Sequence, residues 1–358
     1  MRLTPLYALL CLIAIVTLVG CFLHRPATAG GNDPAMADAQ YAINGIAWIN
    51  SPPMQLSDLK GKVVLVDFWE YTCVNCIRTM PYVKEWWARY KDRGLVIIGV
   101  HTPEFDFAKK VENVQAAVKR FGITYPVVVD SEYRTWRAFN NNYWPHHFLF
   151  DANGKLQHEQ IGEGGYRETE LAIQKLLAEA GQPGSWPEPM ALVRPTNDTG
   201  RACHRITPET YMGYTRGTAG NSGGLRSDKI ADYQLPAKLS DDGWALDGPW
   251  LSANEYVSPA SEGAKLALKY NAAQVYLVAH AALGPAQKLY VAQDGAPISK
   301  TAGTDLKADE RGGTYILVDA SRMYTLVDNG AWGPHELTLT SAGRGLELYS
   351  FTFGTSCE

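Results

Sequence analysis

The chain has 358 residues, of which 46% are hydrophobic and 20% are charged, and its formal net charge at neutral pH is −4. This length predicts two domains, because the hydrophobic core of a single domain stops growing efficiently at shorter chain lengths than this. The weakly acidic balance gives no reason to expect nucleic acid or an anionic membrane surface as a partner.

The first segment predicts an export signal. Arg2 precedes an apolar run, LYALLCLIAIVTLV, which is followed by Gly20 and Cys21. A positive charge, an apolar stretch and a small residue in this order are typical of a secretory signal. The LVGC at its end resembles the lipobox of bacterial lipoproteins, which implies a signal peptide over 1–21 and a lipid on Cys21. A transmembrane anchor over 3–23 is the alternative, and either one tethers an extracytoplasmic protein to a membrane.

Residues 22–41 are small, polar and interrupted by Pro and Gly, which predicts a flexible spacer. Four cysteines remain beyond it, and in an oxidising compartment four thiols suggest two pairs. Cys73 and Cys76 are the local pair, which leaves Cys203 and Cys357 for each other. That second bond closes a long loop and is worth about 3 to 5 kcal/mol in the chain-entropy model. Free thiols, or a relay with the first pair, are the alternatives.

Residues 42–181 alternate short β-rich runs with helical periods, which predicts βαβ units and a mixed or parallel sheet. The predicted strands lie at 62–69, 94–100 and 125–130, and a hairpin at 147–162 turns at Asn153-Gly154. A helical stripe that ends at Gly181 closes this α/β domain.

Residues 182–198 are rich in Pro and Gly and predict a linker. From there to the end, over 199–358, short runs of β-branched and aromatic residues alternate with Gly, Asp and Asn. No long helical stripe interrupts them, so this part predicts an all-β sandwich.

The chemistry-bearing motif is the DFWEYTCVNC sequence, which places Cys73 after a buried strand and at the start of a helix. Free backbone N–H groups and the helix dipole there stabilise a thiolate, the attacking species in disulfide exchange. Cys76, one turn later, is placed to attack a mixed disulfide formed at Cys73. The alternatives are a structural disulfide and a zinc site, but zinc wants four ligands and no second CxxC occurs in the sequence.

These features resemble the thioredoxin superfamily. The run SPPMQLSDLKGKVVLVDFW is similar to the entry of exported TlpA-like and DipZ-like domains, and GVHTPEF and YWPHHFLFD look most like the DipZ-like branch. The resemblance implies a thioredoxin-like fold for 42–181 and thiol:disulfide oxidoreductase activity. It implies no cofactor and no metal, because the electrons travel in the dithiol.

The resemblance also implies roles around the dithiol. Asp67 matches a buried acid that takes a proton from Cys76 during catalysis. Pro145 matches a proline with a cis peptide bond, which brings the Trp144 backbone close to the sulfurs to hold a substrate strand. Glu70 is the weaker candidate for this buried acid, and it is expected, with Thr72, to contact the substrate. Independently of the resemblance, His101, Thr102 and Glu104 follow the second strand at the carboxyl edge of the sheet, and His146 lies beside Pro145, so they are expected to touch the substrate or tune the thiols.

The motif departs from the usual pattern in the residues around the cysteines. Thr72 stands where a Trp is usual, and Val74-Asn75 lies between the cysteines without a proline. These positions tune the redox potential, which leaves the direction of electron flow open. Many exported relatives are reductants that a membrane partner re-reduces, so reduction is the favoured direction.

Residues 199–358 resemble the domain that follows in DipZ-type proteins, through TPETYMGY and LYSFTFG. This implies a sandwich that is jelly-roll-like and similar to carbohydrate-binding modules. A sugar-stacking platform is one interpretation of its aromatic residues, and burial in the core or at a domain interface is the other. The four candidates are Trp244, Trp250, Tyr256 and Trp332.

The sequence therefore predicts a membrane-anchored, extracytoplasmic thiol:disulfide oxidoreductase that reduces disulfides of exported proteins and draws electrons from a membrane thiol donor. One alternative is a thiol peroxidase, although its P-x-x-x-T-x-x-C setting is absent around Cys73. The other is an envelope glycan-binding protein that uses residues 199–358, with the thioredoxin-like part as scaffold. No nucleic acid partner is expected.

Overall fold

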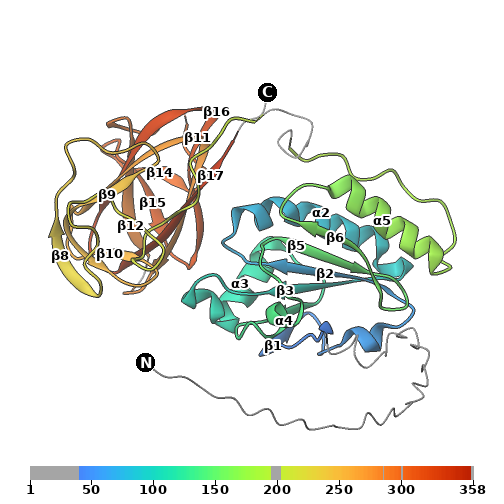
Figure 1. The fold of residues 1–358 in the computed structure, drawn as a ribbon. Helices are drawn as coiled ribbons and strands as arrows, with labels where there is room; N and C mark the ends of the chain where they lie inside the picture. Colours follow the sequence, from blue (N-terminus) through green and yellow to red (C-terminus); the bar gives the residue numbers. More distant parts are fainter. Residues whose placement is uncertain (1–39, 195–202, 285, 300, 356–358) are drawn as a thin grey trace, which may run out of the picture.

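The computed structural model describes residues 40–194, 203–284, 286–299 and 301–355 (Figure 1). The predicted signal peptide, the lipidation site at Cys21, nearly all of the spacer and Cys357 lie outside the described residues. Within them, no helix is long and apolar enough to cross a bilayer.

The N-terminal domain is built on a six-stranded sheet with the strand order β1-β4-β3-β2-β5-β6. Strands β2, β3 and β4 run parallel, whereas β1, β5 and β6 are added antiparallel. The bounds are β1 Ala47–Ile49, β2 Val63–Trp69, β3 Leu95–His101, β4 Val127–Val129, β5 His146–Phe150 and β6 Leu156–Ile161. The predicted mixed sheet and thioredoxin-like α/β fold are confirmed.

Helices cover both faces of this sheet. The crossovers from β2 to β3 and from β3 to β4 are both right-handed in βαβ units, which puts their helices on the same face. Their side chains share one core with those of the closing helix α5, and α4 packs on the other face. The helices are α2 Val74–Tyr90, α3 Val111–Phe121, α4 Arg134–Ala138 and α5 Tyr166–Glu179, with 3-10 turns η1 Leu56–Leu59, η2 Lys91–Arg93 and η3 Asp106–Lys109.

The predicted linker packs against this domain as far as the structure describes it. Residues 182–194 contain no helix or strand, but the Arg93 guanidinium lies 4.5 Å from the centre of the Trp186 ring. Gln174 Nε2 donates to the Pro187 carbonyl, and Val193 N–H donates to the Tyr82 hydroxyl. The chain therefore leaves the domain as a strap held to α2 and α5.

Eleven strands form the C-terminal domain, which confirms the all-β prediction. Hydrogen bonds connect them into one sheet, in which β11 pairs with β16, β17 and β9, so the sheet folds over its own core (Figure 1). The strands are β7 Thr210–Tyr211, β8 Lys229–Tyr233, β9 Trp244–Ser252, β10 Val257–Pro259, β11 Lys265–Ala281, β12 Gln287–Gln293, β13 Ala296–Pro297, β14 Leu306–Ala308, β15 Thr314–Val318, β16 Arg322–Ser341 and β17 Leu346–Gly354.

The aromatic side chains considered as a sugar platform do not share a surface. Trp244 and Trp250 are buried in the core of the C-terminal domain. Tyr256 packs at the boundary with the N-terminal domain, and the half-buried Trp332 stacks on His204. For Trp244 and Trp250 the structure therefore supports the interpretation as core residues rather than as a sugar platform, because a buried ring has no exposed face on which a sugar can stack.

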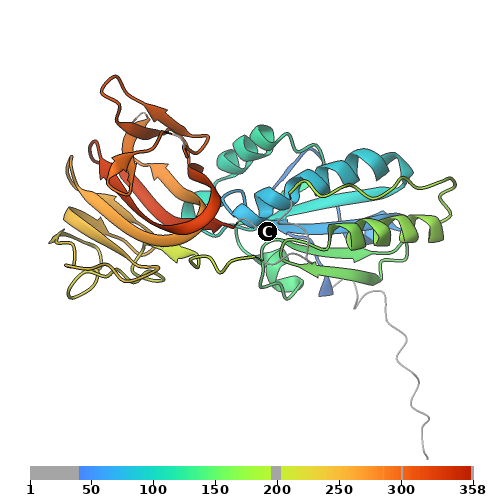
Figure 2. The ribbon, with the colours of Figure 1, turned by 90° about the horizontal axis from the view of Figure 1, so that it is seen from above.

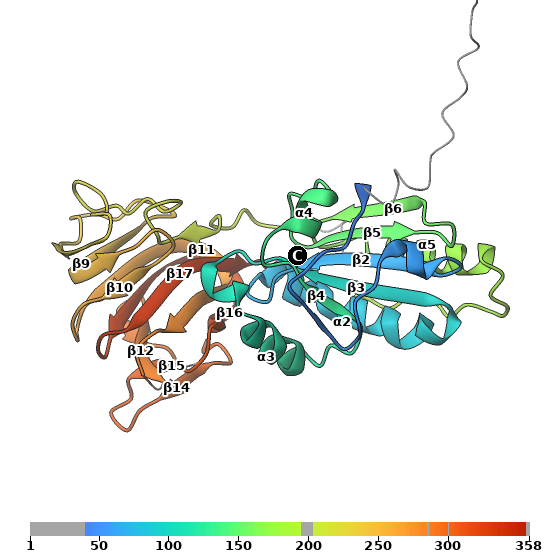
Figure 3. The same ribbon diagram turned by 90° about the horizontal axis from the view of Figure 1, so that it is seen from below.

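The two domains lie side by side, with α3 and the segment before it at their junction (Figures 2 and 3). Val278 and Tyr349 of the C-terminal domain belong to the same buried cluster as the α2 and α3 side chains. The Phe107 and Tyr349 rings meet edge to face with centroids 4.7 Å apart. Asp106 N–H donates to Glu255 across the same boundary. The buried cluster of the N-terminal domain thus extends across the boundary, while the core of the C-terminal domain is a separate cluster.

Glu170 is a test of what holds the strap in place. Its carboxylate is 1% exposed and accepts bonds from the side chains of Trp86, Arg89 and Tyr90 and from Met190 N–H. Glu170→Ala leaves the buried donors of Trp86 and Tyr90 and the Met190 N–H without this acceptor, while Arg89 keeps its pair with Glu85, so we expect it to lower the free energy of unfolding in urea by about 3 kcal/mol.

The exposed Glu168 on the same helix provides the matched control. Glu168→Ala should change the free energy of unfolding by less than about 0.5 kcal/mol. Equal losses in the two variants would contradict the role assigned to Glu170.

Candidate redox site

The two thiols of the CxxC motif differ in access. Cys73 is the N-cap of α2, immediately outside its first turn, and its side chain is partly exposed. Cys76 is 2% exposed, and its N–H donates to Cys73 Sγ at 3.4 Å. Both are free thiols. The site thus offers one accessible sulfur, with a second sulfur buried directly beneath it.

The buried thiol is also the weaker acid. Burial raises the pKa of Cys76 well above its usual range, and the neighbouring Cys73 acts in the same direction. The charge of Asp67 adds to this rise, while a backbone hydrogen bond at Glu70 opposes it. Cys76 is therefore protonated at neutral pH and needs a base before it can attack.

Asp67 lies in the middle of β2 and is 4% exposed. In the antiparallel pairing of β2 with β5 it is directly opposite His147, whose Nε2 lies 3.2 Å from Asp67 Oδ1. Neither atom completes a hydrogen bond. Asp67 and His147 therefore form a buried acid–imidazole pair with unused bonding capacity.

Sequence reasoning considered His146 and missed His147. His146 points to the other side of β5, where its ring nitrogens contact Asn141 Oδ1 at 2.6 Å and Glu159 Oε1 at 2.8 Å. Its side chain is thus occupied in holding the hairpin. The alternation of side chains along a strand would have placed one of the two adjacent histidines toward Asp67, once the register was known.

The Trp144–Pro145 peptide bond is cis, which confirms the expectation for this proline. Because Phe68 pairs with His146, Pro145 lies at the end of β2 from which the chain runs to Cys73. The Trp144 ring packs on Trp136 with centroids 4.3 Å apart. The turn is therefore at the dithiol end of the sheet.

Three predicted substrate contacts lie out of reach of a substrate. Glu70, Thr72 and His101 are 0%, 1% and 0% exposed. The side chain of Glu70 folds back to accept bonds from the Thr72 N–H and hydroxyl, and His101 is enclosed by the rings of Trp69 and Tyr71. The expectation of direct substrate contact is corrected, because these residues form the floor of the site.

The segment after β3 connects the site to the C-terminal domain. Thr102 donates to Asp130 inside the N-terminal domain. Glu104 Oε1 accepts bonds from Tyr211 Oη at 2.7 Å and from the Arg216 guanidinium at 2.9 Å. Burial and the charge of Glu70 raise the pKa of Glu104, and Tyr211 and Arg216 lower it. The two C-terminal partners were missed, because nothing in the sequence places them next to Glu104.

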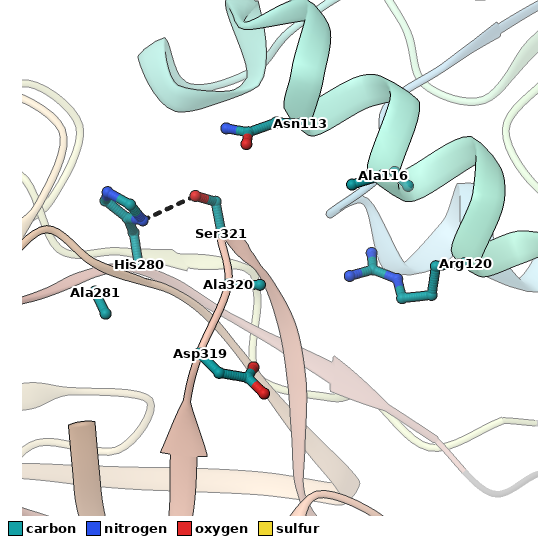
Figure 4. Close-up of a pocket in the computed structure, with 9 residues that line it drawn as sticks. Asn113, Ala116, Arg120, His280, Ala281, Asp319, Ala320 and Ser321 are labelled. Atoms are coloured by element: carbon teal, nitrogen blue, oxygen red, sulfur yellow. Dashed lines mark hydrogen bonds between the residues drawn. The ribbon is translucent and has the colours of Figure 1, made fainter. Parts of the chain in front are cut away.

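A cleft of about 300 Å³ lies between α3 and the C-terminal domain. Asn113 and Arg120 point into it from α3, opposite Ser321, whose hydroxyl is 2.8 Å from His280 Nδ1 (Figure 4). None of the predicted site residues lines this cleft. It is a feature of the domain interface rather than of the dithiol.

Cys203 is disulfide-bonded. Its predicted partner, Cys357, lies outside the described residues, so the pairing of these two stays a prediction. Among the described residues, no group of three or more His, Cys, Asp or Glu side chains is arranged to hold a metal ion.

Two family models match the chain. Residues 50–173 match the family described as Redoxin, and residues 207–354 match the family described as thioredoxin like C-terminal domain. The two matches fall on the two domains of the structure.

Curated relatives agree with these matches. The chain is 36% identical over 318 residues to the protein DipZ of Mycobacterium tuberculosis, an alignment covering 87% of this chain and 42% of that protein. The chain thus spans about two fifths of the length of this relative.

Shorter relatives match the N-terminal domain. The thiol-disulfide oxidoreductase YkuV of Bacillus subtilis is 32% identical over 133 residues, 37% of this chain and 89% of the relative. The thiol-disulfide oxidoreductase ResA of Bacillus thuringiensis is 32% identical over 123 residues, 34% of this chain and 68% of the relative. With the fold and the half-exposed dithiol on the same residues, this chain belongs to the thioredoxin-like thiol-disulfide oxidoreductases.

Proposed function

We propose that the protein is an extracytoplasmic thiol:disulfide oxidoreductase that reduces disulfides in exported proteins. The observation that carries this proposal is the asymmetry of the dithiol. Cys73 is accessible at a helix N-terminus, and Cys76 is buried beneath it against an acid. A nucleophile needs access, whereas a resolving thiol acts only once the mixed disulfide has formed above it.

The exchange takes place in two steps. The Cys73 thiolate attacks one sulfur of the substrate disulfide, which forms a mixed disulfide and releases the other sulfur as a thiolate. Cys76 then loses its proton and attacks Cys73 Sγ, which forms the Cys73–Cys76 disulfide and releases the second substrate thiolate. Two electrons pass from the dithiol to the substrate, and no cofactor is needed.

Asp67 is the base that we assign to the second step. The Cys76 thiol is protonated at neutral pH, because burial raises its pKa, and the Asp67 charge is close enough to contribute to that rise. His147 touches the same carboxylate and gives the proton a second place to reside. The Trp144–Pro145 turn, at the same end of the sheet, is the surface on which a substrate strand docks.

We infer the location from the N-terminal sequence and the direction of electron flow from the compartment. The apolar run before Gly20-Cys21 supports export and a lipid anchor on Cys21. A dithiol in an oxidising compartment needs a source of electrons, and we infer a thiol partner in the membrane as the donor.

Cysteine variants test the exchange reaction. Cys73→Ser should abolish the reduction of insulin disulfides by dithiothreitol through this protein, since the attacking sulfur is gone. Cys76→Ser should instead accumulate a mixed disulfide at Cys73, visible by mass spectrometry. Full activity in Cys73→Ser would reject the proposed function.

An Asp67→Asn variant separates the two steps. We expect formation of the mixed disulfide at an unchanged rate and its resolution by Cys76 slowed by about a hundredfold, because the buried thiol has lost its base. Stopped-flow measurement of both phases in a single turnover gives the two rates. An equal slowing of both phases, or of neither, would exclude Asp67 as the base of the resolving step.

The direction of electron flow is measurable at equilibrium. In a glutathione buffer poised at about −200 mV, a dithiol with the lower potential of a reductant loses its electrons to the buffer. It should therefore be recovered mainly as the Cys73–Cys76 disulfide. Recovery mainly as free thiols would identify an oxidant instead. Alkylation after acid quenching, followed by mass spectrometry, counts the two forms.

A further inference from the structure

A second buried acid–imidazole pair lies beside the dithiol. Asp67 of β2 pairs with His147 of the neighbouring strand β5, whereas the second pair lies toward β3, the neighbour on the other side. Glu70 directly follows β2, and His101 ends the neighbouring parallel strand β3, where it pairs with Trp69. Glu70 Oε1 is 3.7 Å from His101 Nε2, and neither side chain has any exposed surface.

The pair has unused bonding capacity. Glu70 Oε2 is occupied by the two donors of Thr72. By contrast, Glu70 Oε1 and both ring nitrogens of His101 have no hydrogen-bond partner. Buried polar atoms without partners are uncommon and call for a physical explanation. A proton shared between the carboxylate and the imidazole is such an explanation, because it makes the pair neutral as a whole.

Glu70 is in contact with both cysteines through its main chain. Its carbonyl accepts the Cys73 N–H at 3.3 Å, and its backbone makes a hydrogen bond with the Cys76 thiol. Glu70 is therefore the residue whose main chain connects the acid–imidazole pair to the two cysteines. Asp67 is the charged side chain of β2 that acts on Cys76.

The surroundings of the pair include further charges of both signs, with Glu255 acting on Tyr133 and Arg120 acting on Tyr71. Glu104 acts electrostatically on Glu70, and the C-terminal domain offsets its charge through Arg216 and Tyr211. Tyr133 also faces the two carboxylates, but burial and their charges raise its pKa to about 12, which keeps it neutral. Tyr71, stacked on His101, is kept neutral in the same way.

We propose that Glu70 and His101 are positioning residues that share one proton next to the dithiol and so set the pH at which Cys73 becomes a thiolate. With the proton on the pair, Cys73 meets no net charge from it. Once the proton leaves, the Glu70 carboxylate is unpaired and opposes a second negative charge on the sulfur. No electrons move in this step, and the released proton goes to solvent.

This inference rests on the proposed thiol:disulfide exchange, but it can be tested by titrating Cys73 without any exchange reaction. In a Cys76→Ser background, the rate of Cys73 alkylation by iodoacetamide against pH gives the midpoint at which the thiolate forms. Glu70→Gln should move this midpoint down by about one pH unit, since a like charge is removed. His101→Gln should move it up by a similar amount.

The double variant distinguishes a shared proton from two separate effects. Without the Glu70 carboxylate, the imidazole of His101 has no negative charge to neutralise. The double variant Glu70→Gln/His101→Gln should therefore show the same midpoint as Glu70→Gln alone. Additive shifts, or no shift in Glu70→Gln, would overturn the proposal and leave the pair a structural role. Asp294→Asn is the matched control, because Asp294 forms an acid–imidazole pair with His335 on the distant domain.

Arg216→Gln keeps the proposal testable if His101→Gln does not fold. It leaves the packing around His101 intact but removes the cationic partner of Glu104, which keeps only the Tyr211 hydroxyl, so more negative charge faces the pair and the midpoint should rise. An unchanged midpoint would count against the proposal. If the titrations behave as expected while the wild-type protein does not reduce insulin, the exchange function fails and the charge coupling stands.

Discussion

The pairing of β2 with its two neighbours is the constraint on which the site depends. All seven residues of β2 are buried, although one of them is an aspartate. A buried acid has to face another polar group, and the register supplies it, with His147 opposite Asp67. On the other side, the parallel register with β3 ends at His101, next to Glu70. Two acids and two imidazoles thus converge where the chain turns into α2.

This arrangement explains why two chemically identical thiols behave differently. Cys73 caps the helix and remains in contact with solvent, whereas Cys76 is buried, and the charge of Asp67 acts on it. Burial and negative charge both oppose ionisation of Cys76, as its raised pKa shows. The strand register therefore decides which groups meet and, in the proposed mechanism, the order in which the two sulfurs react.

The C-terminal domain is part of this arrangement. Tyr349 packs on Phe107 as part of the buried cluster of the N-terminal domain, and Glu104 binds Arg216 across the boundary. The C-terminal domain thus supplies the positive charge that neutralises Glu104, a carboxylate close to the buried residues of the redox site. Separating the two domains would remove both C-terminal partners of the Glu104 carboxylate and expose it to water.

The sequence was sufficient for features that depend on local pattern. Apolar runs, Gly and Pro located the strands of both domains, and the position of Cys73 between a strand and a helix located the redox site. The cis bond at Pro145 came from resemblance. His147 was beyond reach because its partner depends on strand register, and Arg216 because domain docking brings it to Glu104. The choice between a sugar platform and a buried position for Trp244 and Trp250 stayed open, because composition alone cannot distinguish a core from a surface.

The strap along α2 and α5 has a consequence for how firmly the domains stay together. The chain is fixed to the N-terminal domain as far as Val193 and to the C-terminal domain from Arg205, whose carbonyl accepts a bond from the Trp332 ring nitrogen. At about 3.5 Å per residue, the segment between these two points reaches at most about 42 Å when fully extended. A detached C-terminal domain would therefore remain at an effective concentration on the order of millimolar around its docking surface. Even an interface of modest intrinsic affinity would then be closed most of the time.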